Sequence, residues 1–123
     1  MTDNSKRTGA AVEAHYQFLM WLVPAIEKFP RSHKFTTGDR IQILALDVLE
    51  ALIAATYTRE RLQHLRQANL GVEKLRFLFR LAADLRLLDR RRCDFLIGRL
   101  HHVDLETRGG GNGAYQFKPA RLN

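Results

Sequence analysis

Basic residues with the chemistry of phosphate binding gather between residues 59 and 92 of this sequence. That segment holds ten Lys and Arg residues against four Asp and Glu residues, so it carries a net charge of +6, while the whole chain of 123 residues carries +7. Most of these cations are arginines, whose guanidinium group donates two parallel hydrogen bonds to a phosphate. The excess favours a nucleic acid as partner over a general contribution to solubility. The candidate residues in this segment are Arg66, Lys74, Arg76, Arg80, Arg90, Arg91 and Arg92.

Two of these residues, Arg76 and Arg80, lie one helical turn apart. They could present a paired positive site that binds a phosphate or an acidic protein surface. The alternative is a solvated helix face, on which Glu73 pairs with one of these arginines and Asp84 pairs with Arg80.

The run Arg90 to Arg92 directly follows Asp89, which is a natural cap for the start of a helix. Cations oppose the helix dipole at that end, so helix stability does not explain the run. The run could serve ligand binding or solubility, and its inclusion in the binding site rests on its charge alone.

Groups that could support catalysis or bind a metal are sparse. Asp47 and Glu50 lie three residues apart, but the Glu-x-x-His pattern of carboxylate metal sites in helical bundles is absent. His102 and Glu106 are four residues apart, but the adjacent His101 and His102 face about 100° apart and cannot both bind one metal from a regular helix. Cys93 falls on an apolar helix face, where a thiol is inert. No Gly-x-x-x-x-Gly-Lys-Ser/Thr loop occurs. The sequence therefore predicts no enzyme, no metal site and no cofactor.

The elements that must position these residues are all expected to be helices. Apolar residues recur every three or four positions, and good helix formers dominate the middle of the chain. We expect one helix that ends near Phe29 and is kinked or divided at Pro24, and a second that begins after residues 36–39. A third covers about residues 59–88, and a fourth follows Asp89. Short connections between four helices predict an all-α, antiparallel four-helix bundle.

The length and composition bound the domain organisation. A hydrophobic fraction of 46% over 123 residues supports one packed domain, expected at residues 11–108. Residues 1–10 are polar and residues 109–123 open with a Gly-rich run, so both ends are expected to be flexible. The longest apolar stretch, residues 18–23, is far shorter than the roughly 20 residues of a membrane span, and no export signal is evident, so we expect a cytoplasmic protein with no membrane partner.

The third expected helix carries two apolar stripes where a monomeric bundle needs one. The broad stripe is formed by Ala68, Val72, Leu75, Leu78, Phe79 and Ala82, and the narrow one by Leu70, Phe77, Leu81 and Leu88. In the first helix Trp21 points almost opposite to the expected core face of Val12, Tyr16, Leu19, Val23 and Ile26. Either neighbouring helices wrap these positions, or Trp21, Leu70, Phe77 and Leu81 form a subunit interface. Gly71 in the same helix indicates either a helix break or a close approach by another helix.

The chain resembles the Avd family, the accessory variability determinants of diversity-generating retroelements. The resemblance covers about residues 15–100. It rests on the order and spacing of the strings Tyr16-Gln17-Phe18-Leu19, Trp21-Leu22-Val23-Pro24, Glu27-Lys28-Phe29-Pro30-Arg31, Gly38-Asp39-Arg40-Ile41-Gln42, Ala45 to Ile53, Ala68-Asn69-Leu70-Gly71 and Leu75 to Leu81.

This resemblance implies a four-helix bundle that assembles into a barrel-like homopentamer with basic surfaces. It also implies two partners, a reverse transcriptase and its structured template RNA, with cDNA as a possible further one, and an accessory role without catalysis. The matching basic positions are Arg76, Arg80 and Arg31. Related proteins encoded in ribosomal RNA intervening sequences share the bundle without a reverse transcriptase. A structural or regulatory bundle that binds RNA or an acidic protein is therefore the alternative.

Overall fold

The computed structural model describes the backbone of residues 3–110 and the side chains of residues 9–104. Within these residues every element of secondary structure is a helix. Its elements are α1 (Asp3–Glu27), the short α2 (Arg31–His33), the π-helical turn η1 (Lys34–Gly38), α3 (Asp39–Tyr57), α4 (Arg61–Asp84) and α5 (Arg90–Gly110).

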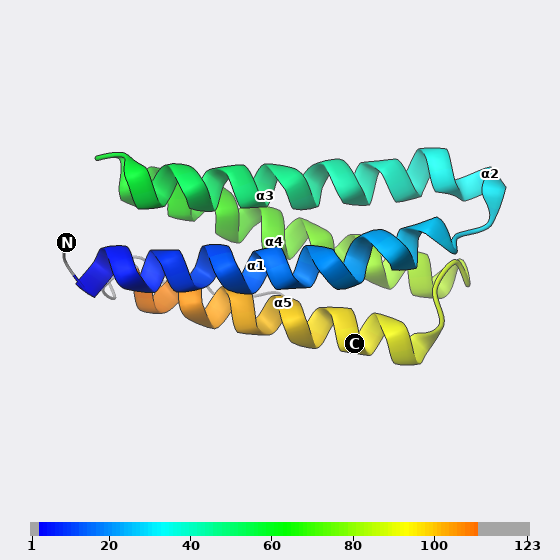
Figure 1. Cartoon of the computed structure of the whole chain (residues 1–123). Helices are drawn as coiled ribbons and strands as arrows, with labels where there is room; N and C mark the ends of the chain where they lie inside the picture. Colours follow the sequence, from blue (N-terminus) through cyan, green and yellow to red (C-terminus); the bar gives the residue numbers. More distant parts are fainter. Residues whose placement is uncertain (1–2, 111–123) are drawn as a thin grey trace.

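The four long helices form the antiparallel bundle that the sequence predicts (Figure 1). Helix α1 packs along α5 and α3, and α4 packs along α3 and α5, so that the four helices close into a ring around one core. The pairs α1–α5 and α3–α4 therefore form opposite sides of the bundle. The end of α1, the α4–α5 connection and the start of α5 lie at the same end of the molecule (Figure 1).

The core combines one apolar stripe from each helix. On α4 the expected broad stripe is buried, apart from the half-buried Leu78, and on α5 Cys93, Leu96, Leu100 and Val103 are buried. On α1 the expected core face is partly correct, because Leu19 and Ile26 are buried, but Tyr16 is exposed. The centre of the buried stripe lies about one position earlier, at His15, Phe18 and Leu22. The middle of α1 is apolar nearly all round, so periodicity does not single out one face. Because His15 is polar, the sequence pattern did not indicate that the stripe containing it is the buried one.

The cap of α5 at Asp89 is as expected, whereas α3 begins near the expected position without a capping side chain, because Gly38 before it is already helical. Helix α3 begins at Asp39, and the backbone N–H of Arg92 donates to Oδ1 of Asp89 over 2.8 Å, which confirms Asp89 as the cap of α5. The helical turns at residues 31–38 do not follow from the sequence pattern. Pro30 precedes them with an extended backbone that ends the preceding helix, and the buried Gly38 allows close packing there, since a Cβ would lie 3.0 Å from Ile26.

Three other boundaries differ from the sequence-based expectation. Helix α1 starts at Asp3, so residues 3–10 continue the helix, and it runs through Pro24 without dividing. Helix α5 includes Gly109 and Gly110, while the expected tail at residues 111–123 lies outside the described residues.

Helix α4 ends at Asp84 rather than Leu88, because the chain turns there in a Schellman motif. The N–H of Leu87 donates to the carbonyl of Ala82 (2.8 Å), and that of Arg86 donates to Ala83 (3.0 Å). The motif requires a left-handed residue, and Arg86 occupies that position with φ 59°.

Gly71 marks a close approach between helices, which is the second of its two expected explanations. Helix α4 continues through Gly71, and a Cβ at this position would lie 2.4 Å from Cγ2 of Val48 on α3. Only glycine allows α3 and α4 to pack this closely at their crossing.

None of the helices within the described residues combines the length and the apolar character needed to span a bilayer.

Candidate nucleic-acid interface

The predicted binding residues lie just after α1, along α4 and at the start of α5. Most predicted binding residues have exposed side chains, and these are Arg31, Arg66, Lys74, Arg80, Arg90, Arg91 and Arg92. Arg80 makes only a long ion pair with Asp84, with 4.0 Å between Nε and Oδ2, and both side chains are about half exposed. Such a pair contributes little to stability, so Arg80 is available to a ligand.

Arg76 does not lie on this surface, and the expected exposed pair of Arg76 and Arg80 is therefore not formed. Arg76 is only 5% exposed. Its Nη1 donates to Oε2 of Glu73 over 2.6 Å, and its Nη2 lies 3.7 Å from Oδ2 of Asp104 on α5. The pairing with Glu73 is the alternative that the sequence left open. A buried cation held by two carboxylates links α4 to α5 and has no access to a phosphate.

Arg76 belongs to a buried polar seam that sequence reasoning missed. The seam consists of His15, Asn69, Glu73, Arg76 and Asp104, which all lie inside the bundle. The sequence pattern suggests a solvated strip for its members on α4, because polar residues usually face water. The sequence signal for this buried seam is that His15 and Asp104 interrupt the apolar stripes of α1 and α5.

His15 is neutral in the folded protein. Its Nε2 lies 2.7 Å from the carbonyl oxygen of Ala45 on α3, so this nitrogen carries the hydrogen and donates it. Burial lowers the pKa of His15 to about 4, and the hydrogen bond to Ala45 opposes that shift only in part.

The end of the bundle where α1 stops and α5 begins is strongly basic. Arg31 follows α1, Arg86 lies in the α4–α5 connection, and the run Arg90 to Arg92 opens α5, all with exposed side chains. We call this set the basic end. It brings together residues from segments that are far apart in the sequence (Figure 1).

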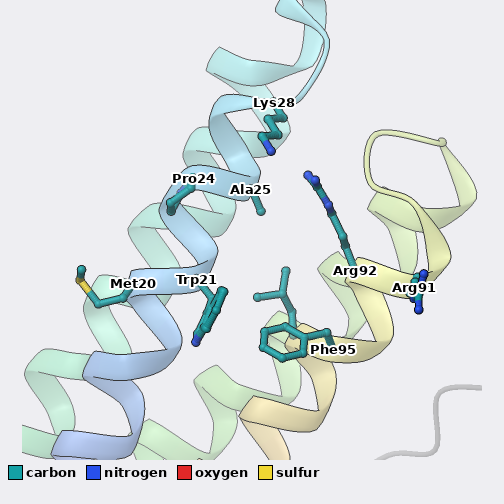
Figure 2. Close-up of a pocket in the computed structure, with 9 residues that line it drawn as sticks. Met20, Trp21, Pro24, Ala25, Lys28, Arg91, Arg92 and Phe95 are labelled. Atoms are coloured by element: carbon teal, nitrogen blue, oxygen red, sulfur yellow. The ribbon is translucent and has the colours of Figure 1, made fainter.

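A groove between α1 and α5 opens beside the basic end (Figure 2). Its volume is about 530 Å³, and its lining includes Trp21, Pro24 and Lys28 from α1 together with Arg92 and Phe95 from α5. The rings of Trp21 and Phe95 meet edge to face, with centroids 5.1 Å apart and an angle of 76° between the planes. Lys28 and Phe95 were not among the predicted site residues.

The predicted interface residues fall on two opposite sides of the bundle. Leu70, Phe77 and Leu81 are exposed on α4, and Phe77 lines a shallow depression together with exposed Ile43 of α3. We call these four residues the α3–α4 face. Trp21 lies across the bundle in the α1–α5 groove, so it does not extend this face, and Leu88 is buried and does not belong to it.

The remaining chemical candidates are not assembled into a site. Asp47 and Glu50 are exposed on α3. Cys93 is buried, its thiol donates to the carbonyl oxygen of Phe79 (3.4 Å), and burial together with the nearby Asp94 raises its pKa. Within the part of the chain that the structure describes, no three His, Cys, Asp or Glu residues gather as metal ligands would.

The fold and surface define this chain as a small, basic, helical-bundle protein. Comparison with known families identifies it further, because the bAvd-like family matches residues 9–104, which include parts of all four long helices. The chain belongs to the bAvd-like family, and the resemblance to Avd proteins is confirmed. Comparisons with curated proteins and with solved structures give no match.

Proposed function

We propose that this protein is a non-catalytic accessory protein of a diversity-generating retroelement. It binds the retroelement's reverse transcriptase and structured template RNA, and thereby supports the copying of that RNA into mutagenised cDNA. Membership of the bAvd-like family supports this role. The observation that carries the RNA-binding part is the basic end, where exposed arginines from three segments lie at one end of the bundle.

The basic end suits the backbone of a folded RNA better than its bases. Arginines on helix starts and turns reach phosphates on a curved surface, and such contacts set position and affinity without reading sequence. Arg80 lies at the end of α4 next to this set and extends it. Binding of this kind releases counterions, so it weakens steeply as salt rises.

Substitution of Arg31→Gln and Arg90→Gln should lower the salt dependence of RNA binding. Removal of one cation that neutralises a phosphate reduces the slope of log K against log salt by about 1, so the double variant should show a slope smaller by about 2. The measurement is fluorescence anisotropy with a labelled, structured RNA between about 50 and 200 mM salt.

Arg59→Gln provides the control, because Arg59 is exposed in the α3–α4 connection at the opposite end of the bundle. Its slope should match the wild type. Equal slopes for all variants would contradict the basic end as the RNA site. RNA binding without co-purification of a reverse transcriptase encoded beside this protein would favour the intervening-sequence type of bundle.

The α3–α4 face supports the assembly part of the proposal. Its four exposed aliphatic and aromatic side chains lie on two neighbouring helices, with Arg40, Asp47 and Lys74 close by, and exposed apolar side chains with polar residues around them are typical of subunit interfaces. A ring such as a pentamer needs a heterologous contact, in which this face packs against a different surface of the next protomer.

Phe77→Glu should therefore convert the assembly into monomers, because a carboxylate would be desolvated at the interface. Multi-angle light scattering gives the mass directly. Phe35→Glu is the matched control, since Phe35 is 65% exposed and lies in η1, away from the α3–α4 face. A wild type that is monomeric at all concentrations would refute the assembly proposal.

A further inference from the structure

The α1–α5 groove combines aromatic faces with cations, and the fold uses neither fully. Trp21 is 53% exposed and Phe95 is 45% exposed, although each ring contacts the other. Two exposed aromatic rings fixed against each other on neighbouring helices form a rigid apolar platform. Nothing in the packing of the bundle requires an indole at this position.

The cations of the groove converge above this platform. Figure 2 shows Lys28 extending from α1 and Arg92 extending from α5 into the space between the helices, with Arg91 on the outer side. Arg92 shares a 3.7 Å ion pair with Asp89, and about half of its side chain is exposed. Lys28 has no ion pair within the described residues, and no acidic side chain is among those that line the groove.

Two cations aimed into one space repel each other and favour an anion between them. The volume of the groove, about 530 Å³, lies within the range of small-ligand sites. A base can stack on an exposed ring while the adjoining phosphate lies between the two cations. The same arrangement recurs wherever proteins hold single-stranded nucleic acid, because every base offers a π-face.

We propose that the α1–α5 groove binds an unpaired nucleotide of the RNA, with its base stacked on the ring of Trp21 beside Phe95 and its phosphate between Lys28 and Arg92. This inference rests on the proposed RNA-binding function and specifies where and how the protein holds a single-stranded part of that RNA. The basic end grips the backbone of the folded RNA, and the groove holds a base that leaves the stack.

An acidic peptide or a second copy of this chain is the competing occupant. A peptide helix would need a longer apolar surface than two rings provide, and its carboxylates would leave the ring faces unused. A second copy would have to bring an acidic surface to Lys28 and Arg92, while this chain is basic overall. The combination of ring faces and converging cations therefore favours a nucleotide.

Trp21 is the only tryptophan of the chain, so its fluorescence reports on the groove alone. We expect a short single-stranded RNA to quench this fluorescence on binding to the full-length protein, and a fully paired RNA of the same length to quench it much less. Trp21→Leu should weaken binding of the single-stranded RNA about tenfold, while Trp21→Phe keeps a ring and most of the affinity. Lys28→Gln should weaken it several-fold and lower the salt slope by about 1.

The controls carry the same chemical changes elsewhere on the surface. Tyr57→Leu removes an exposed aromatic ring from the end of α3, and Arg59→Gln removes an exposed cation beside it. Both should bind single-stranded RNA like the wild type, as measured by anisotropy with a labelled RNA. Circular dichroism of each variant shows whether the bundle is intact.

The outcomes separate this inference from the proposed function. Salt-sensitive binding of structured RNA without quenching of Trp21 fluorescence would refute the nucleotide site in the groove and would still support RNA binding at the basic end. Absence of any RNA binding would overturn both. Quenching by an acidic peptide but not by RNA, or a change of assembly mass in Trp21→Leu without RNA, would assign the groove to a protein partner or to a second copy and refute the nucleotide.

Discussion

Replacement of Arg76 by leucine is expected to destabilise the bundle by about 3–5 kcal/mol. The side chain is buried between Glu73 on its own helix and Asp104 on α5. Its removal takes a cation away from two buried carboxylates, and the cost of that exceeds the gain from an added apolar side chain. Denaturant unfolding followed by circular dichroism measures the loss as a lower midpoint at an unchanged slope.

Arg80→Leu is the matched control, because it makes the same change one turn further along α4. The ion pair of Arg80 with Asp84 is exposed and long, so this variant should lose less than about 1 kcal/mol. A triple variant that replaces Arg76, Glu73 and Asp104 by leucine should recover much of the stability, since a buried ion pair replaced as a unit is often close to neutral. Equal losses for Arg76→Leu and Arg80→Leu would show that the buried seam has no special energetic role.

The second large effect is a loss of stability in mild acid that originates in His15. Between about pH 6.5 and pH 4 the unfolded chain binds a proton on this imidazole, whereas the folded chain does not, because burial lowers its pKa to about 4. Protonation therefore favours the unfolded state, and the free energy of unfolding falls by about 1.4 kcal/mol per pH unit across that window. The total from this residue is roughly 3 kcal/mol, and the stability is regained as the pH rises.

His15→Gln isolates this contribution, because glutamine can still donate a hydrogen bond to the carbonyl of Ala45 but does not titrate. The difference in unfolding free energy between wild type and variant should shrink, or reverse in favour of the variant, as the pH falls from 7 to 4. Urea unfolding at several pH values gives this difference directly. Parallel pH profiles for the two proteins would contradict a depressed pKa at His15.

The sequence predicts the architecture well because the bundle depends on local periodicity. The cap at Asp89 follows from residues within one turn of the feature itself. For Gly71 the sequence left a helix break and a close approach open, and Val48 on α3 decides between them. The last turn of α4 does not follow in this way, because a left-handed arginine is an unusual way to end a helix.

The candidate site was only partly predictable, because burial depends on which helices become neighbours. Arg76 and Arg80 look alike in sequence, yet only Arg76 faces the carboxylate of Asp104, which lies on a different helix. Likewise Trp21 and Phe95 meet only because α1 and α5 pack side by side. Charge identifies most of the exposed cations but also the buried Arg76, and the groove between α1 and α5 depends on the pairing of two distant segments.

At the left-handed Arg86, in the turn between α4 and α5, the residue that gives the most stable backbone is not the residue that gives the most positive surface. An L-residue with a side chain is strained by about 1–2 kcal/mol in this conformation, which glycine adopts freely. Any replacement that relaxes the backbone here, such as glycine, also removes a cation from the end of the molecule. Selection for a more stable turn and selection for a more basic surface therefore oppose each other at one residue, and a version of this protein optimised for heat resistance would be expected to bind polyanions less tightly.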